Sequence, residues 1–280
     1  MGKLRTLPFV VLALTFLYAC QEDTKTNDNA STDTLAQNDY DDIEEDIDIP
    51  SNTTFKLPSP VELYLFLWEE DAKFTSESLN PIENSKKYFT TPKKAINFGV
   101  FASDLAYCTV FSKNQETFTY FTTVKSIADE MGLTEGFDEA IATRINENIN
   151  NADSLYNITA TSYESATNFL ENQEEGNLLP YILAGAWIES VHIAISSIEK
   201  FSENDEIVIR IAEQQFLLEN LMDYLKSIER NNDLNKLHKQ LKDLQGSFDK
   251  LYDNTDVIIT KEQYDEITKK VESLRADFIS

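Results

Sequence analysis

Three ionisable side chains in apolar surroundings are the strongest candidates for chemistry in this 280-residue chain. Asp104 lies within residues 95–111, while Glu189 and His192 lie within residues 178–195, and both stretches are apolar on nearly every side. A helix without a polar face belongs in a core, or in a membrane if it is long enough. A carboxylate in such a helix must be paired, hydrogen-bonded or shifted in pKa. Asp104, Glu189 and His192 are therefore the candidate ligand-binding or metal-binding residues.

The spacing of Glu189 and His192 suggests a specific kind of metal site. Residues three apart share one face of a helix, and di-iron carboxylate bundles use a Glu-x-x-His step twice, with two further glutamates. The second histidine, His238, follows Asn235 at that spacing, so the second motif is missing. This pattern argues against a full di-iron site and leaves a mixed divalent-metal site with Asp104. The alternative is that Glu189 and His192 bond each other or face solvent.

Composition and motifs exclude several other classes of function. A net charge of −25 argues against a nucleic-acid binder, because phosphate contacts need clustered Lys and Arg. Seven glycines are too few for a β-rich chain with many tight turns, and two cysteines cannot make a disulfide scaffold. Cys108 is expected to behave as a small buried hydrophobe. The chain contains no nucleophile elbow, phosphate loop or zinc-ligand spacing, so we predict no catalytic residue.

The first twenty residues have the pattern of a secretory signal. Lys3 and Arg5 precede the apolar run Leu7–Ala19, which is too short to span a bilayer. The run ends in Leu17-Tyr18-Ala19-Cys20, which resembles a bacterial lipobox, although Tyr18 is larger than the usual residue there. The resemblance implies that Cys20 becomes the new N-terminus and carries lipid such as palmitate. The alternative is an ordinary signal peptide with an incidental cysteine.

The segment after Cys20 is strongly acidic. Residues 21–50 hold eleven Asp and Glu against Lys25 alone, among mostly small polar residues. Such a stretch buries too little apolar surface to offset chain entropy, which predicts a disordered tether over residues 20–56. Gln21 follows Cys20 where inner-membrane lipoproteins usually have Asp. This favours the outer membrane and leaves its face open. We therefore divide the chain into a signal peptide (residues 1–19), the tether and a helical domain (residues 57–280).

The helical domain is expected to be all-α, with about eight to ten helices. No segment shows a sustained period of two, so strands are not predicted. Further helices are expected from Thr134 and from Asn151 to Gly176. The remaining predicted helix starts carry capping residues or an early proline, at Ser59-Pro60, Asn80-Pro81, Thr91-Pro92, Ser112–Gln115, Pro180, Asp205 and Thr260–Gln263.

The two parts of this domain differ in their patterning. Residues 57–200 read as a core of mixed helices, whereas residues 204–280 repeat apolar residues at 3-4 spacing. These short repeats predict a bundle or stacked helix hairpins that end in an antiparallel coiled-coil-like hairpin. Gly99 and Gly185 lie inside the two most apolar helices. Because glycine weakens a helix by roughly 1 kcal/mol relative to alanine, we expect these glycines to allow a close helix–helix approach.

The overall layout resembles that of uncharacterised all-helical lipoproteins of Gram-negative bacteria. The resemblance rests on Leu17–Cys20, the acidic Gln21–Asp48 segment and the Ala184–Glu189 stretch. It implies an envelope location and no particular activity. The first hypothesis is a non-enzymatic binding or scaffolding lipoprotein, held on the membrane through Cys20, with an envelope protein or small ligand as its partner and no nucleic acid. The alternative is a metal- or cofactor-binding helical protein that uses the three candidate residues.

Overall fold

The computed structural model describes residues 59–133, 178–253 and 259–280, together with scattered residues between 143 and 161. All of these belong to the second of two compact units, residues 52–280. The signal peptide, Cys20 and the acidic residues 21–50 belong to the first unit and lie outside the described residues. Most of the segment in which helices are predicted from Thr134 and Asn151 also lies outside them.

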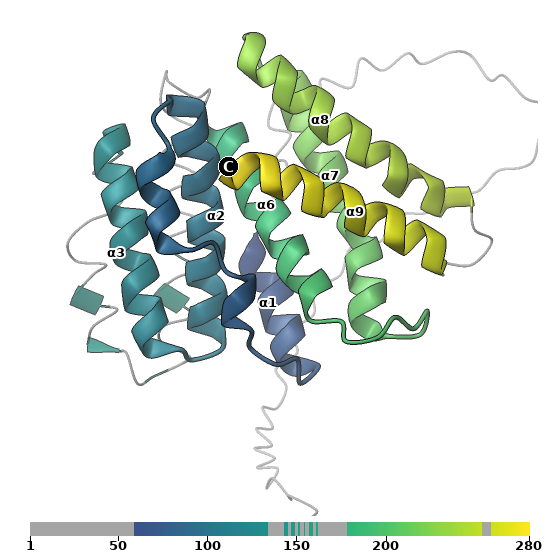
Figure 1. Ribbon diagram of the computed structural model, residues 1–280, viewed down its shortest axis with the longest axis horizontal. Coiled ribbons are helices and arrows are strands. Elements are labelled where there is room, and N and C mark those ends of the chain that lie inside the picture. The colour runs from purple at the N-terminus through teal and green to yellow at the C-terminus, as the bar shows by residue number, and fades with distance from the viewer. Residues whose placement is uncertain are drawn as a thin grey trace, which may run out of the picture. The chain divides into compact units, whose positions relative to one another are not determined.

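The described part of the chain is made of helices and their connections, and none of it is strand, which confirms the all-α prediction. Figure 1 shows the arrangement of these helices. Three short 3-10 helices are η1 (Ser76–Ser78), η2 (Ile82–Lys87) and η4 (Asp249–Asp253). The α-helices are α1 (Pro60–Glu69), α2 (Thr91–Val110), α3 (Asn114–Met131), α6 (Leu179–Ser196), α7 (Glu206–Ser227), α8 (Asn232–Phe248) and α9 (Lys261–Ile279).

Helices α2 and α6 pack directly against each other at the centre of this unit. A Cβ atom added to Gly99 would lie 2.0 Å from the carbonyl oxygen of Ile182, and one added to Gly185 would lie 2.0 Å from that of Ile96. Each glycine therefore points a Cα–H at a backbone carbonyl of the opposite helix, a contact that no other residue permits. The predicted close approach is confirmed.

Helix α6 is buried along its whole length, since every residue from Leu179 to Ile195 is buried. By length and composition alone it is the one described helix apolar enough to cross a membrane, yet 94% of that window is buried inside the unit. Burial of this degree matches the core position that its lack of a polar face predicts.

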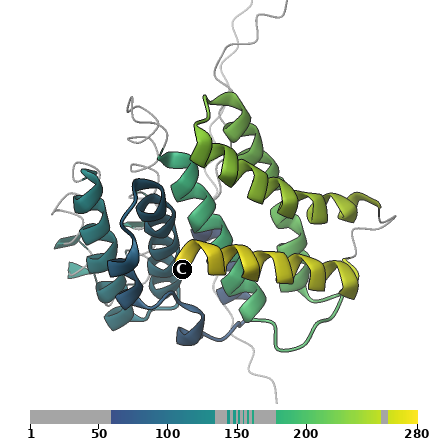
Figure 2. The same cartoon turned by 45° about the horizontal axis from the view of Figure 1, so that its top comes forward.

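The other helices cover the two sides of this central pair. Helix α3 packs on α2, and α1 contacts both α2 and α6. The later helices α7 and α9 contact α6 (Figures 1 and 2). Helices α8 and α9 form the predicted antiparallel hairpin. The heptad positions of the two helices are buried, which confirms their core role, at Leu234, Leu237, Leu241, Leu244 and Phe248 and at Tyr264, Ile267, Val271, Leu274 and Phe278.

The predicted helix starts are mostly confirmed. Thr260 and Gln263 form a reciprocal capping box on α9, and the side chain of Asp205 accepts from two backbone N–H groups of α7. The capping box predicted at Ser112 is wrong. Helix α3 begins at Asn114 without a side-chain cap, because Ser112 adopts a left-handed φ of 55° in the turn that closes α2.

The C-terminal end of α9 is anchored on α2. The last carbonyls of a helix have no partner within the helix and need donors from elsewhere. Asn97 Nδ2 donates to Phe278 O at 2.8 Å, and Lys93 Nζ donates to Asp277 O. These bonds fix the position at which α9 crosses α2 and α6, and so place its side chains at the buried cluster described next.

Candidate functional site

Asp104 and Glu189 meet at the centre of the fold, where they are joined by an arginine from α9. Both acids are fully buried, Asp104 on α2 and Glu189 on α6. Arg275 Nε donates to Glu189 Oε2 and Arg275 Nη2 donates to Glu189 Oε1, each at 2.7 Å. This two-bond pairing is the strongest form of the Arg–carboxylate interaction. It neutralises the charge of Glu189 and fastens α9 to α6.

Asp104 lies on the other side of this ion pair, where the surroundings favour its protonated form. Burial raises the pKa of Asp104 well above its ordinary value, and the negative charge of Glu189 raises it further, while Arg275 opposes the rise. Asp104 Oδ2 accepts from the backbone N–H of Asn80 at 3.1 Å. Asp104 Oδ1 is buried without a hydrogen-bond partner among the described residues. A raised pKa favours the uncharged form of Asp104, which lowers the repulsion between the two acids.

His192 lies one turn beyond Glu189 and makes separate contacts. Its Nδ1 is 2.6 Å from Glu272 Oε1 and its Nε2 is 3.1 Å from the carbonyl oxygen of Ser78. Both ring nitrogens of His192 therefore have an oxygen partner within hydrogen-bond distance. Arg275 Nη2 donates to the same Ser78 carbonyl at 2.9 Å. His192 therefore joins the cluster through α9 and η1.

Asn80 ties the connection between α1 and α2 into the cluster. The sequence predicts that Asn80 caps a helix, and that prediction is wrong, since Pro81 is the N-cap residue of η2 and no side chain caps it. Instead, Asn80 Oδ1 accepts from Asn84, Nδ2 donates to Tyr88 Oη, and its carbonyl accepts from Tyr120 Oη at 2.9 Å. Asn80 therefore joins α2, α3 and η2 through hydrogen bonds instead of capping a helix.

The three candidate residues are only partly brought together. Asp104 and Glu189 are adjacent, whereas His192 faces Glu272 and Ser78. A metal ion at Glu189 would have to displace the two bonds from Arg275, and both nitrogens of His192 already have partners. Among the described residues, no group of three or more His, Cys, Asp or Glu is arranged to hold a metal ion. The arrangement is suited to clamping α2, α6, α9 and η1 together.

Sequence reasoning missed the residues that complete the cluster, above all Arg275 and Glu272. Both lie on α9 beside its apolar stripe, next to Leu274 and Val271. The sequence contains one signal for this role, because Arg275 directly follows the buried heptad position Leu274. Cys108, by contrast, is buried without a disulfide, and burial raises the pKa of its thiol far above the usual range, as expected for a small hydrophobe.

Asp104→Asn should change how stability depends on pH. Asparagine is uncharged at every pH and keeps an acceptor for the backbone N–H of Asn80. Because the folded pKa of Asp104 is raised, its stabilising effect is complete below the unfolded pKa and is lost as pH rises through the folded pKa. Between the unfolded pKa and the folded pKa the wild type should lose about 1.4 kcal/mol per pH unit relative to Asp104→Asn, and the difference should level off above the folded pKa. Urea unfolding across a pH series measures this, and parallel profiles would contradict it.

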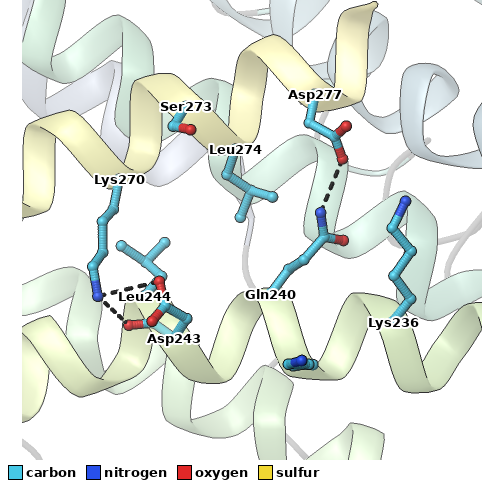
Figure 3. A pocket seen from close by; sticks show the side chains of 9 residues that line it. Lys236, Gln240, Asp243, Leu244, Lys270, Ser273, Leu274 and Asp277 are labelled. Atoms are coloured by element: carbon cyan, nitrogen blue, oxygen red, sulfur yellow. Dashed lines mark hydrogen bonds and ion pairs between the residues drawn. The ribbon is translucent and has the colours of Figure 1, made fainter.

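The described surface also contains an open groove between α8 and α9, shown in Figure 3. It has a volume of about 600 Å³, with Leu244 and Leu274 at its base. Its two acids are paired, Asp243 with Lys270 Nζ at 3.2 Å and Asp277 with Gln240 Nε2 at 2.9 Å. Lys236 and Lys239 also line it, and neither has an ion pair or hydrogen bond within the described ranges. The groove therefore presents two free cations on an otherwise acidic chain.

No protein family model, curated protein or solved structure matches this chain.

Proposed function

We propose that this chain is a lipid-anchored binding protein of the bacterial cell envelope, without enzymatic activity, in which the helical unit holds a ligand or partner. The observation that carries the proposal is that the three candidate residues make structural contacts within the fold. Asp104, Glu189 and His192 are each engaged by other residues of the fold, so the acids and the imidazole that could do chemistry hold helices together instead.

The groove between α8 and α9 supports the binding half of this proposal. Ligand sites are concave, mostly apolar and supplied with a few polar groups. The groove combines a leucine base with the free ammonium groups of Lys236 and Lys239. Its walls are two helices whose apolar faces are packed into the core, so the site is held in shape before a ligand arrives.

Cys20→Ser should release the protein from membranes. Lipid on Cys20 would provide the anchor, because serine cannot accept the thioether-linked lipid of a lipobox cysteine and multiple acyl chains are needed for stable attachment. Fractionation of cells, with labelled palmitate as the lipid tracer, measures the effect. The matched control is Cys108→Ser, which should stay membrane-bound and labelled because Cys108 is buried in α2.

A membrane-bound, unlabelled Cys20→Ser protein would contradict the lipid anchor. Separation of inner and outer membranes on a density gradient tests, in the same cells, which of the two membranes holds the protein. The wild type is expected in the outer-membrane fraction, and recovery with the inner membrane would overturn that part of the proposal.

A further inference from the structure

A smaller cavity of about 270 Å³ lies where four helix ends meet. It is lined by Pro92 from the start of α2, Tyr181 from the start of α6, Asp233 from the start of α8 and Phe278 from the end of α9. Lys236, Gln240 and Asp277 line both this cavity and the α8–α9 groove, so the two are continuous.

The helix ends give this cavity a positive field. The N-termini of three long helices, α2, α6 and α8, all reach it, and a helix N-terminus favours negative charge. The opposite end of the α9 dipole is offset, because Lys93 Nζ donates to Asp277 O and Asn97 Nδ2 donates to Phe278 O. An anion here would therefore meet the favourable N-terminal ends of three helices. It would also meet the C-terminal end of α9, whose last carbonyls already have donors.

Lys236 adds a free cation at the same place. It points from α8 toward α9, beside the bond between Gln240 and Asp277 (Figure 3). Nothing in the described part of the chain forms a hydrogen bond or ion pair with its ammonium group. Two carboxylates also line the cavity, Asp233 and Asp277, the second of which accepts from Gln240. Lys93 lines it as a second cation, bonded to the end of α9.

Tyr181 provides a second, independent sign of a missing ligand. Its side chain is only 3% exposed, and its hydroxyl has no hydrogen-bond partner. Buried hydroxyls are nearly always bonded, so an unpartnered one at a cavity indicates an acceptor that the chain itself does not supply. Burial, with the charge of Asp233, raises the pKa of Tyr181 to about 12, which keeps the hydroxyl a donor at neutral pH.

Beside Thr90 and Lys93, the cavity has an apolar wall. Ile96, Leu237 and Phe278 line it, and Leu237 and Phe278 are almost completely buried. A hydrated inorganic ion gains nothing from such walls, whereas an organic anion can bury its hydrocarbon part against them. The site thus combines donors suited to an acidic group with a surface suited to a short apolar body.

We propose that this cavity binds a small amphipathic carboxylate, with its acidic group near Lys236 and the Tyr181 hydroxyl and its hydrocarbon part against Ile96, Leu237 and Phe278. A longer ligand would continue into the α8–α9 groove. This inference rests on the proposed binding role and names the class of ligand.

Calorimetric titration with hexanoate tests the proposal on the full chain carrying Cys20→Ser, so that no attached lipid competes. Hexanol and hexylammonium are the neutral and cationic probes of the same length. Hexanoate should bind at millimolar concentrations or below, and the other two should not saturate. Lys236→Gln should weaken hexanoate binding roughly tenfold to a hundredfold, as expected for loss of one charged hydrogen bond.

Two further variants separate the site from general effects of charge and stability. Tyr181→Phe removes only a hydroxyl that has no partner, so it should fold normally and still weaken hexanoate binding. Lys242→Gln is the matched control, because Lys242 is an exposed lysine of α8 that lines neither the cavity nor the groove. It should bind hexanoate like the parent chain.

The proposal would be overturned if hexanoate failed to bind, if hexanol bound as tightly, or if Lys236→Gln and Lys242→Gln had equal effects. Each of these outcomes leaves the membrane attachment of Cys20 untouched, because that is measured separately by fractionation. Failure of attachment with intact hexanoate binding would in turn overturn the anchor alone.

Discussion

Glu189→Gln should lower the free energy of unfolding by about 3–5 kcal/mol, the range found when one member of a buried ion pair is removed. Glutamine takes up nearly the same volume, so the loss is not one of packing. The change removes the carboxylate that pairs with the Arg275 guanidinium in the interior. Urea unfolding followed by circular dichroism at neutral pH measures the difference.

Glu199→Gln is the matched control for this substitution. Glu199 pairs with Lys73 at 2.8 Å, a distance close to that of the buried pair, but both side chains are more than four-fifths exposed. Solvent screens such a pair, so its removal should leave the unfolding midpoint almost unchanged. If Glu189→Gln were as mild as Glu199→Gln, the buried pair would not hold the fold together.

Gly99→Ala and Gly185→Ala should each destabilise the protein by about 1–3 kcal/mol or more, the range for overpacking a core. The added methyl would lie 2.0 Å from a backbone carbonyl oxygen in each case, and a backbone cannot rotate aside as a side chain can. Helices α2 and α6 would have to separate. Thermal and urea unfolding of the two variants measures the cost.

Gly246→Ala provides the control of opposite sign. Gly246 lies in α8, and a Cβ there meets nothing within 4 Å. Alanine should therefore stabilise the protein by about 1 kcal/mol through helix propensity alone. Stabilisation by alanine at position 99 or 185 would show that the two central helices do not cross as closely as described.

The local features of the fold were accessible from the sequence because their causes are local. Gly99 and Gly185 stand out as interior glycines in apolar helices, and the crossing explains them. The 3-4 spacing of leucines identified the buried faces of α8 and α9, and Thr260 with Gln263 identified a cap. The capping box predicted at Ser112 is wrong because the backbone turn that ends α2 places this serine in the left-handed region, although its side chain favours a cap.

The candidate site was only half predictable because its partners are remote in sequence. Apolar surroundings correctly singled out Asp104 and Glu189 as buried acids. The residue that neutralises Glu189, Arg275, lies 86 positions later, and no spacing rule connects the two. Similarly, the Glu272 contact of His192 depends on where α9 crosses α6, which the bonds from Lys93 and Asn97 to the end of α9 determine.

The role of Glu189 and Arg275 as a structural clamp is tested most directly by a double-mutant cycle. Unfolding free energies are measured for Glu189→Gln, Arg275→Gln and the double variant. The clamp predicts that the double variant is destabilised by much less than the sum of the singles, with a coupling well above 1 kcal/mol, because neither charge is then left alone in the core. Costs that add to within about 0.5 kcal/mol would contradict it.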